Sequence, residues 1–414
     1  MTPGPATDFL FSLERFGMKF GLANMAALCE ALDHPERAYP SILIGGTNGK
    51  GSVAAMVDAA LCAQGHAAGR YTSPHLHRLE ERFAIGGRDV DADRLEASAA
   101  RIRAAVDALL ASGRLEAPPT FFECTTAVAF DLFREARVDA AVLEVGLGGR
   151  LDATNVVTPV ATAIVSIDFD HQAQLGDTLA SIAAEKAGII KPGVPVVCGA
   201  MPADAMDVIA RTAAERGAPL VATDGDRALA DRVAAIPLAL AGAHQRLNAA
   251  VALRLLEIVD ADSRHGVRVG DGARRAGLST ARWPGRLEEV VYRGRPVVLD
   301  AAHNPAGARA LASYLLNAAP GGVTLVFGAM KDKAVTEMLR ELAPVVRTIV
   351  CTTAPTRRAI PAVELADTAR AAGLEAVAVD DPLAAVDRAC AAPQPVVVAG
   401  SIFLVGAVRE RLLP

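Results

Sequence analysis

A glycine-rich loop at residues 45–52, with the sequence Gly-Gly-Thr-Asn-Gly-Lys-Gly-Ser, constrains the fold of this chain more than any other feature. The short run Ser41–Ile44 before it favours a buried strand. The segment Val53–Leu61 after it is rich in good helix formers. A strand, a glycine loop and a helix in this order bind phosphate, because small residues let backbone N–H groups approach an anion and the helix N-terminus adds unpaired donors.

Side chains of the loop support the same interpretation. Lys50 can reach the terminal phosphates of a nucleotide, and the hydroxyls of Thr47 and Ser52 are available to phosphate or magnesium. The usual P-loop pattern is not met literally, since Ile44 stands where its first glycine would fall and Gly51 follows the lysine. The alternative is a glycine-rich turn that binds nothing. The agreement of strand, loop, lysine and helix favours phosphate binding.

Composition limits the classes of protein to consider. The 414 residues are enough for two or three domains with a sizeable core. A formal net charge of −5 and 4% aromatic residues argue against a nucleic-acid-binding protein, but they allow a local basic pocket for ATP. The six cysteines are far apart and form no CxxC pair, which is typical of core residues in a reducing compartment. Neither a signal peptide nor a long apolar run is visible, so we expect a cytoplasmic protein that binds no membrane.

Polar side chains follow three predicted strands at the end where open α/β sheets place ligands. They are Ser73 after the strand at 68–71, Glu144 near the end of the strand at 138–146, and His171 after the strand at 160–167. A buried carboxylate must be paired or bound to a cation, so Glu144 is predicted to be a magnesium ligand. The three side chains could converge at one edge of the sheet. The alternatives are an ordinary turn at Ser73, a structural ion pair at Glu144 and an exposed histidine at His171.

The pattern of the chain changes near residues 283–286. Before this point, helical segments at 8–32 are broken near residues 17–21, and helices are expected over 91–111, 122–136 and 244–259. Lys186 lies on a further predicted helix and is most simply a surface lysine. After this point, strands and helices alternate compactly over about 130 residues. The strands are expected near 287–292, 296–300, 323–327, 347–351, 375–379 and 395–399.

We therefore predict an α/β protein of two domains. Residues 1–282 form a P-loop-containing N-terminal domain with a largely parallel sheet flanked by helices. Residues 283–414 form a smaller, Rossmann-like C-terminal domain. Asp300 and His303 lie at a strand-to-helix junction of the second domain, which is another edge where ligands bind.

Several stretches together resemble the folylpolyglutamate synthase and dihydrofolate synthase family, whose relatives are the Mur ligases of peptidoglycan synthesis. The resemblance runs almost from end to end. It rests on residues 46–52 (the family's own form of the phosphate loop), 72–76 (Thr-Ser-Pro-His-Leu), 143–155, 185–189 (Glu-Lys-Ala-Gly-Ile), 244–245 with 248, 284–286 (Pro-Gly-Arg) and 300 with 303–305. The phosphate loop and the stretch from Leu143 to Asn155 are the specific ones.

The resemblance implies an ATP and magnesium enzyme. The expected ATP-binding residues are Thr47, Asn48, Gly49, Lys50, Gly51, Ser52, Asn248, Arg286, Asp300 and His303. The expected magnesium ligands, for two metal sites, are Ser73, Glu144 and His171. Lys186 is expected to be the lysine that such enzymes carry as a carbamate. Lys50, Lys186 and His171 are the residues expected to take part in catalysis.

The resemblance also implies where the pterin-bearing substrate binds. Those positions are Lys19, Phe20, Gly21, Phe122, Glu123, Leu151, Asp152 and Ala153. The chain departs from the family at two places. Residues 19–21 stand where some bifunctional members have an acidic residue before the glycine, and residues 168–171 differ slightly around the metal histidine, which is retained.

The expected reaction is ATP-dependent addition of L-glutamate to dihydropteroate, to a folate, or to both. Phosphorylation of the acid gives an acyl phosphate, which the amino group of glutamate attacks. The expected partners are these small molecules, and the protein is expected to be a monomer. A Mur-type ligase acting on a muramyl peptide is the nearest alternative, disfavoured because Gly51-Ser52 follows Lys50 where Mur ligases usually have threonine. A non-catalytic ATP-binding switch protein is the alternative from a different class.

Overall fold

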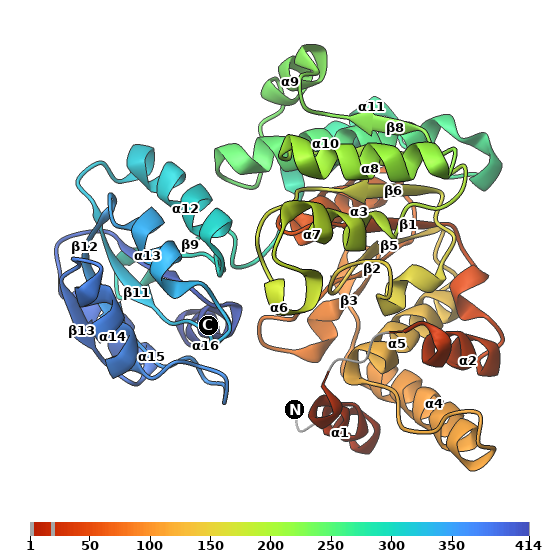
Figure 1. The fold of residues 1–414 in the computed structure, drawn as a ribbon, viewed down its shortest axis with the longest axis horizontal. Helices are drawn as coiled ribbons and strands as arrows, with labels where there is room; N and C mark the ends of the chain where they lie inside the picture. The colour runs from red at the N-terminus through yellow and green to blue at the C-terminus, as the bar shows by residue number, and fades with distance from the viewer. Residues whose placement is uncertain (1–3, 18–20, 414) are drawn as a thin grey trace. The chain divides into compact units, whose positions relative to one another are not determined.

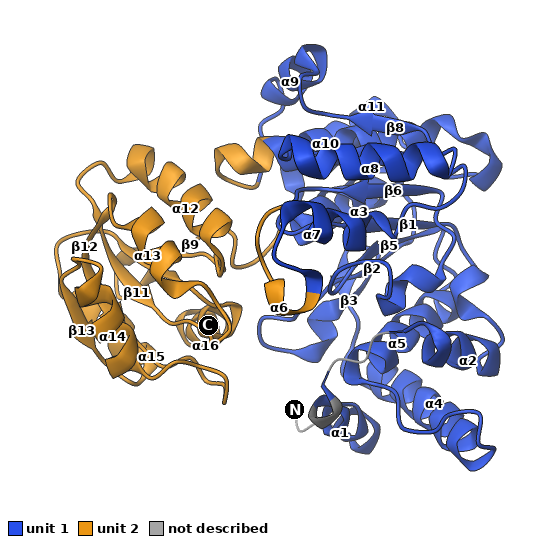
Figure 2. Ribbon diagram, viewed as in Figure 1, with its two compact units in different colours: residues 1–167, 175–239, 247–281 blue, residues 168–174, 240–246, 282–414 orange. Residues whose placement is uncertain are grey.

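The computed structural model describes residues 4–17 and 21–413, which form two compact units (Figures 1 and 2). The first unit contains the residues up to Ile167, Leu175–Ala239 and Leu247–Ala281. The second contains Arg282–Pro414 and two short segments, Asp168–Gln174 and Leu240–Arg246. No sequence pattern indicated that these two segments pack with the second unit. Within the described residues, none of the helices is long and apolar enough to cross a membrane.

The first unit is built on a mostly parallel sheet of eight strands in the order β4-β3-β2-β5-β1-β6-β7-β8. The strands are β1 (Ser41–Gly45), β2 (Ala68–Tyr71), β3 (Phe83–Ile85), β4 (Arg88–Asp89), β5 (Ala140–Glu144), β6 (Ala161–Ile164), β7 (Val196–Cys198) and β8 (Leu220–Ala222). The pairs β2–β3 and β3–β4 are antiparallel, and the other pairs are parallel. The carboxyl ends of β1, β2, β5 and β6 therefore meet at one edge of the sheet.

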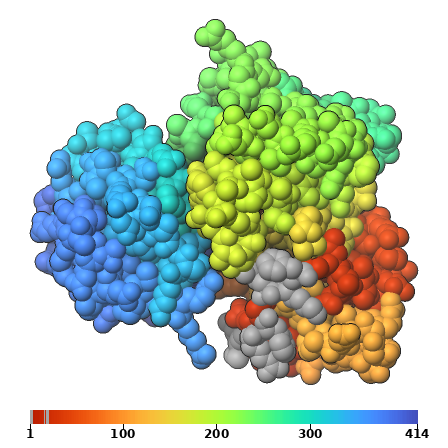
Figure 3. Space-filling model, in the orientation of Figure 1, coloured from red at the N-terminus to blue at the C-terminus, as the bar shows by residue number. Residues whose placement is uncertain are grey.

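Helices of this unit pack on the sheet and on one another. They are α1 (Pro5–Ser12), α2 (Ala23–Ala31), α3 (Lys50–Gln64), α4 (Ala92–Ala111), α5 (Phe121–Glu135), α7 (Leu179–Ala187), α8 (Ala203–Glu215), α9 (Arg227–Ala234), α10 (Ala243–Ala261, in this unit from Leu247) and α11 (Asp271–Thr280). The first helical region is broken as expected, at Gly17 and Gly21, which both have positive φ. Helix α4 forms part of the surface seen in orange in Figure 3.

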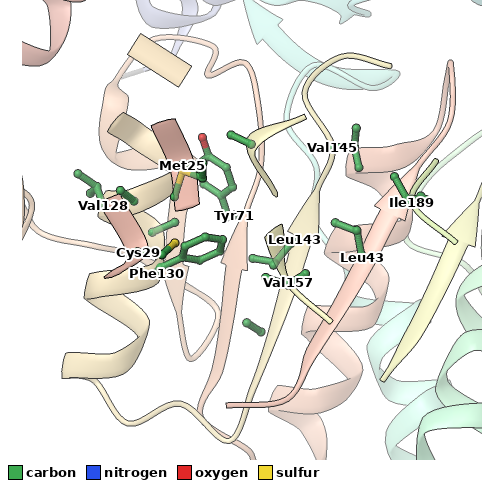
Figure 4. Close-up of a cluster of buried hydrophobic side chains, with 14 of the residues drawn as sticks. Met25, Cys29, Leu43, Tyr71, Val128, Phe130, Leu143, Val145, Val157 and Ile189 are labelled. Atoms are coloured by element: carbon green, nitrogen blue, oxygen red, sulfur yellow. The ribbon is translucent and has the colours of Figure 1, made fainter. Parts of the chain in front are cut away.

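The core of the first unit lies between the sheet and its helices. Leu43 on β1 pairs in register with Leu143 on β5, and Leu143 pairs with Tyr71 on β2. Figure 4 shows these three side chains among the buried cluster that also includes Phe130 of α5. Helix α3 packs against α11 at Gly277, where a Cβ atom would overlap with Ala60. This burial fixes the strand ends that carry the candidate site.

The second unit is a six-stranded sheet in the order β13-β12-β11-β14-β10-β9. Its strands are β9 (Glu288–Tyr292), β10 (Arg295–Leu299), β11 (Val323–Phe327), β12 (Val346–Cys351), β13 (Ala376–Ala378) and β14 (Val396–Ala399). Only the β9–β10 pair is antiparallel among the described strands of this sheet. Its helices are α12 (Pro305–Ala318), α13 (Val335–Leu342), α14 (Ala362–Ala371), α15 (Pro382–Cys390) and α16 (Ile402–Leu412), and the short α6 (Gln172–Leu175) lies almost wholly in the segment Asp168–Gln174. The predicted α/β class is confirmed in both units.

Candidate active site

The glycine-rich loop joins β1 to α3 and has the geometry of an anion-binding turn. Gly49 precedes the first residue of α3 with φ of 84°, and Gly46 has φ of 141°. A Cβ atom on Gly49 would overlap with Asn248 Oδ1 of α10 and lie 2.9 Å from Val165 Cγ1, while one on Gly46 would lie 3.0 Å from the Val165 nitrogen. Both positions therefore require glycine, for conformation and for space.

Hydrogen bonds from two backbone N–H groups to Ser166 hold this loop against the end of β6. The Thr47 N–H donates to Ser166 O at 2.8 Å, and the Asn48 N–H donates to Ser166 Oγ at 3.0 Å. Lys50 folds back over the loop, where its Nζ donates to Thr47 O at 3.1 Å. Ser52 is buried in the first turn of α3. Ser166 is a structural partner of the loop that no sequence pattern indicated.

Lys186 of α7 lies against the same loop. Its side chain is buried, with 5% of the residue exposed, and Nζ donates to Gly46 O at 3.0 Å. Burial of a lysine is uncommon, because the ammonium loses its hydration. The simplest sequence interpretation, a surface lysine, is therefore wrong.

Two of the three expected magnesium ligands lie together at the edge of the sheet. Glu144 is the last residue of β5 and is 4% exposed, and its Oε2 accepts a hydrogen bond from the Ser73 N–H at 3.1 Å. Ser73 follows β2, the parallel neighbour of β5, so strand pairing brings the two together. His171 lies in the segment that packs with the second unit, and its convergence with the other two stays a prediction. Among the residues that the structure describes, no group of three or more His, Cys, Asp or Glu side chains could hold a metal ion.

The expected pterin-binding residues surround the loop that follows β5. Phe122 lies on Gly146, where a Cβ atom would be 2.5 Å from Phe122 Cζ, and it also packs against Tyr71 with ring centroids 6.0 Å apart. Leu151 is half-buried and Ala153 is buried. Gly21 has φ of 144°, whereas Lys19 and Phe20 lie outside the described residues.

The two expected carboxylates of this region already have internal hydrogen bonds. Glu123 forms a capping box with Thr120 at the start of α5, in which Oε2 accepts from the Thr120 N–H at 2.7 Å. Asp152 accepts hydrogen bonds from the N–H groups of Gly146, Leu147 and Thr154 at 2.9–3.0 Å. Burial raises the pKa of the Asp152 carboxyl, and these hydrogen bonds oppose the shift. Both side chains therefore shape the region whether or not they also contact a substrate.

The expected nucleotide residues of the second unit lie around the end of β10. Asp300 is buried and accepts hydrogen bonds from the N–H groups of Leu287 and Ala302, both at 2.9 Å. Burial raises the pKa of the Asp300 carboxyl, and the Arg286 guanidinium opposes that shift. His303 Nδ1 lies 2.9 Å from Ala301 O, and since a carbonyl only accepts, Nδ1 carries the hydrogen.

Comparisons with known proteins decide the family. The chain is 34% identical to the dihydrofolate synthase/folylpolyglutamate synthase of Bacillus subtilis, over 98% of both sequences. This chain belongs to the folylpolyglutamate synthase/dihydrofolate synthase family. Residues 285–402 separately match the family described as the glutamate ligase domain of Mur ligases.

Solved structures of the folylpolyglutamate synthase/dihydrofolate synthase family share the fold. A Mycobacterium tuberculosis folylpolyglutamate synthase complexed with ADP and AMPPCP matches with a TM-score of 0.89 and 33% identity, over 99% of both chains. A bifunctional folylpolyglutamate synthase/dihydrofolate synthase with Mn, AMPPNP and L-glutamate bound matches with a TM-score of 0.84 and 33% identity, over 99% of this chain and 98% of that one. The predicted family and enzyme class, an ATP-dependent ligase, are confirmed. The individual site residues stay predictions.

One polar cluster in this member of the family was not expected from sequence. Asp170 accepts hydrogen bonds from Lys333 Nζ at 2.6 Å and from Asn304 Nδ2 at 3.0 Å, and His303 Nε2 lies 3.6 Å from its Oδ2. Burial alone would raise the pKa of the Asp170 carboxyl, but His303 and Lys333 hold it well below its usual range. The sequence signal was limited to Asp170 standing beside His171; nothing in it linked Asp170 to residues more than 130 positions away.

Proposed function

We propose that this protein adds L-glutamate to dihydropteroate, to a folate, or to both, through an acyl phosphate. The observation that carries the proposal is the phosphate loop with Lys186 buried against Gly46 O, in a chain of the folylpolyglutamate synthase/dihydrofolate synthase family. Two of the relatives with solved structures were crystallised with adenine nucleotides, and one of these also with L-glutamate. These are the ligands that the proposed reaction needs.

The reaction has two steps. A carboxylate oxygen of the acid attacks the γ-phosphorus of ATP, the bond to the ADP oxygen breaks, and an acyl phosphate forms. The amino group of glutamate then attacks the acyl carbon, the bond to phosphate breaks, and the ammonium proton is released to give the amide. Such transfers depend on positioning and on neutralisation of charge. In this chain the N–H groups at the N-terminus of α3 and the Lys50 ammonium supply donors and positive charge to the phosphates.

The residues of the sheet edge fit a divalent cation. Glu144 is a buried carboxylate with the Ser73 N–H on one oxygen, and hard cations prefer oxygen ligands. We assign Ser73, Glu144 and His171 as the ligands, with two metal sites in all. Magnesium bound there would neutralise charge on the phosphates. Asn248, Arg286, Asp300 and His303 are assigned to contact ATP.

The acid is assigned to the region around the Gly146 loop. Phe122 supplies an aromatic surface there, and Glu123, Leu151, Asp152, Ala153 and residues 19–21 complete the assigned set. We expect a cytoplasmic monomer, consistent with a substrate set made up of small molecules.

Lys186 is assigned as a carbamate. Burial disfavours the ammonium form, and a neutral amine adds carbon dioxide with release of a proton, which turns a cation into an anion. With ¹³C-labelled bicarbonate, the wild-type protein should show a carbamate carbon resonance that Lys186→Ala removes. Lys191→Ala is the matched control, because Lys191 Nζ also donates to a carbonyl, Asn155 O, at 2.8 Å. A resonance that persists in Lys186→Ala would contradict the assignment.

Phosphate release tests the function directly. The purified protein is given ATP, magnesium and L-glutamate with dihydropteroate, tetrahydrofolate or a nucleotide-linked muramyl peptide. Glutamate-dependent release with one or both pterin substrates is the expected result. Release with the muramyl peptide alone would favour a Mur-type ligase, and nucleotide binding without release from any acid would favour a switch protein.

A further inference from the structure

Arg82 is buried without a carboxylate partner. It is the only arginine in the described part of the chain that counts as buried, with 7% of the residue exposed. No described Asp or Glu side chain lies within 4.0 Å of its guanidinium. An arginine is almost never buried unless it is paired, because a desolvated charge is unstable without a counter-charge.

Neutral groups hold the guanidinium in place. Arg82 Nε donates to His75 Nδ1 at 2.9 Å, and the guanidinium carbon lies 5.1 Å from the centroid of the Phe121 ring. Phe11 stacks on Phe121 with centroids 5.8 Å apart. The Tyr71 hydroxyl bonds to Thr125 and Thr126, and burial raises the pKa of its phenol, so it stays neutral. These contacts fix the orientation of the guanidinium, and the carboxylates of Glu14 and Glu144 favour its charge only from beyond ion-pair distance.

Other well-covered arginines of the same unit are paired. Arg70 and Arg274 each have side chains that are 12% exposed. Arg70 Nη1 lies 3.2 Å from Asp58 Oδ2, and Arg274 Nη2 lies 2.5 Å from Asp260 Oδ2. Arg82 lacks the carboxylate partner that these two arginines have. Its guanidinium is therefore available to the anion of a ligand.

The position of Arg82 matches the proposed acid-binding region. The Thr72 N–H donates to Arg82 O at 3.0 Å, and the next residue, Ser73, donates its N–H to Glu144. Phe121, under the guanidinium, directly precedes Phe122, which lies on Gly146. A pterin acid lying along this wall would bring its carboxylate to the sheet edge where Glu144 ends β5.

We propose that Arg82 binds the carboxylate of the acyl substrate, a pteroic acid or a folate, through the Nη side of its guanidinium. The inference rests on the proposed function, because it needs an acid bound in this region. Nε is committed to His75 and one face to Phe121, so the terminal N–H groups form the fork that suits a carboxylate. Arg82 is then a determinant of specificity for acids over their neutral analogues.

Binding of pteroic acid and of its carboxamide, measured by calorimetry without ATP, tests this role. The two probes differ in the charge of one group. Wild-type protein should prefer the acid by roughly ten- to a hundred-fold, the range of a charge-assisted hydrogen bond. Arg82→Gln should bind both probes about equally, and Arg82→Lys should keep part of the preference. Arg70→Gln, which removes a covered but paired arginine, should keep the wild-type preference.

The ratio of the two affinities separates recognition from structure. A merely structural Arg82 would weaken both probes to the same extent in Arg82→Gln and leave the ratio unchanged, which would overturn the inference. If Arg82→Gln does not fold, the same decision rests on Arg82→Lys and on the wild-type ratio. Equal wild-type binding of both probes would overturn the inference but leave the proposed function in place. Wild-type protein that binds neither probe and releases no phosphate would overturn both.

Discussion

Replacing Gly49 with alanine tests whether the phosphate loop depends on the geometry described above. Gly49 lies at the N-terminus of α3 with φ of 84°, and Gly65 lies at the C-terminus of the same helix with φ of 100°. A residue with a side chain at either position would be destabilised by about 1–2 kcal/mol, because a Cβ atom is unfavourable in the left-handed backbone conformation. Gly65→Ala is therefore a control for backbone conformation, because its Cβ would meet nothing within 4 Å.

The two sites differ in packing. A Cβ on Gly49 would overlap with Asn248 Oδ1 and lie 2.9 Å from Val165 Cγ1, closer than real Cβ contacts. Overpacking of this kind costs about 1–3 kcal/mol. We expect Gly65→Ala to lower the free energy of unfolding by about 1–2 kcal/mol and Gly49→Ala by about 2–5 kcal/mol. Relief of the overlap requires the loop to move, so Gly49→Ala should also weaken ATP binding roughly tenfold or more.

The measurements are urea denaturation followed by circular dichroism, and ATP titration by calorimetry. A third variant, Gly49→Ala with Asn248→Ala, trims the side chain that the new methyl group meets. It should be less destabilised than the sum of the two single variants by about 1 kcal/mol, the sign of a direct contact. The geometry would be refuted if Gly49→Ala matched Gly65→Ala in stability and the wild type in ATP affinity.

Three further predictions follow from the same contacts. Lys50→Ala should leave the fold intact but lower turnover by orders of magnitude, because a cation at the phosphates is lost; near-normal turnover would contradict the assignment of the loop. Glu288→Gln should raise the KM for ATP, because Glu288 Oε2 accepts from the Gly285 N–H at 2.8 Å and is paired with Arg409 at 2.9 Å, which fixes the turn before Arg286. Glu341→Gln, which breaks a comparable pair with Arg309, should leave that KM unchanged. Burial and the Arg82 guanidinium lower the pKa of His75 to about 3, so between that value and 6.5 the unfolded chain binds one more proton than the folded one. The free energy of unfolding should fall by about 2 kcal/mol from pH 7 to 5. Urea denaturation should show a smaller fall for the His75→Gln variant over the same range.

Local signals explain why much of the fold could be predicted from sequence. The strand at Ser41–Gly45 is a short apolar run between Pro40 and Gly46. The six strands of the second unit begin and end within one or two residues of their expected positions. β3 and β4 were missed, since at three and two residues they are too short for an alternating pattern to show. β8 was missed as well, and its Leu220–Ala222 run has no distinguishing feature except its neighbour β7.

Tertiary partners explain what could not be predicted. Lys186 looks like an exposed helical lysine in sequence, and only packing against Gly46 shows that it is buried. Arg82 stands between two glutamates and a phenylalanine, which is typical of a solvated segment, yet the structure places it over Phe121. The pairing of Asp170 with Lys333 joins residues that no local pattern connects. Burial of a charge is decided by what lies opposite it, and a single sequence does not contain that information.

The carboxylates of the candidate site divide into two chemical kinds, and this division bears on how substitutions there are interpreted. Asp152 and Asp300 each accept backbone hydrogen bonds on both oxygens, so removing either charge leaves buried N–H groups unsatisfied and disturbs a loop. Loss of activity at these positions therefore does not by itself show contact with a ligand. Glu144 accepts a backbone hydrogen bond on Oε2 at the carboxyl end of a parallel strand, where a cation would be bound. An isosteric Glu144→Gln keeps an oxygen for the Ser73 N–H but removes the charge, whereas Asp152→Asn replaces one of two oxygens that accept backbone hydrogen bonds.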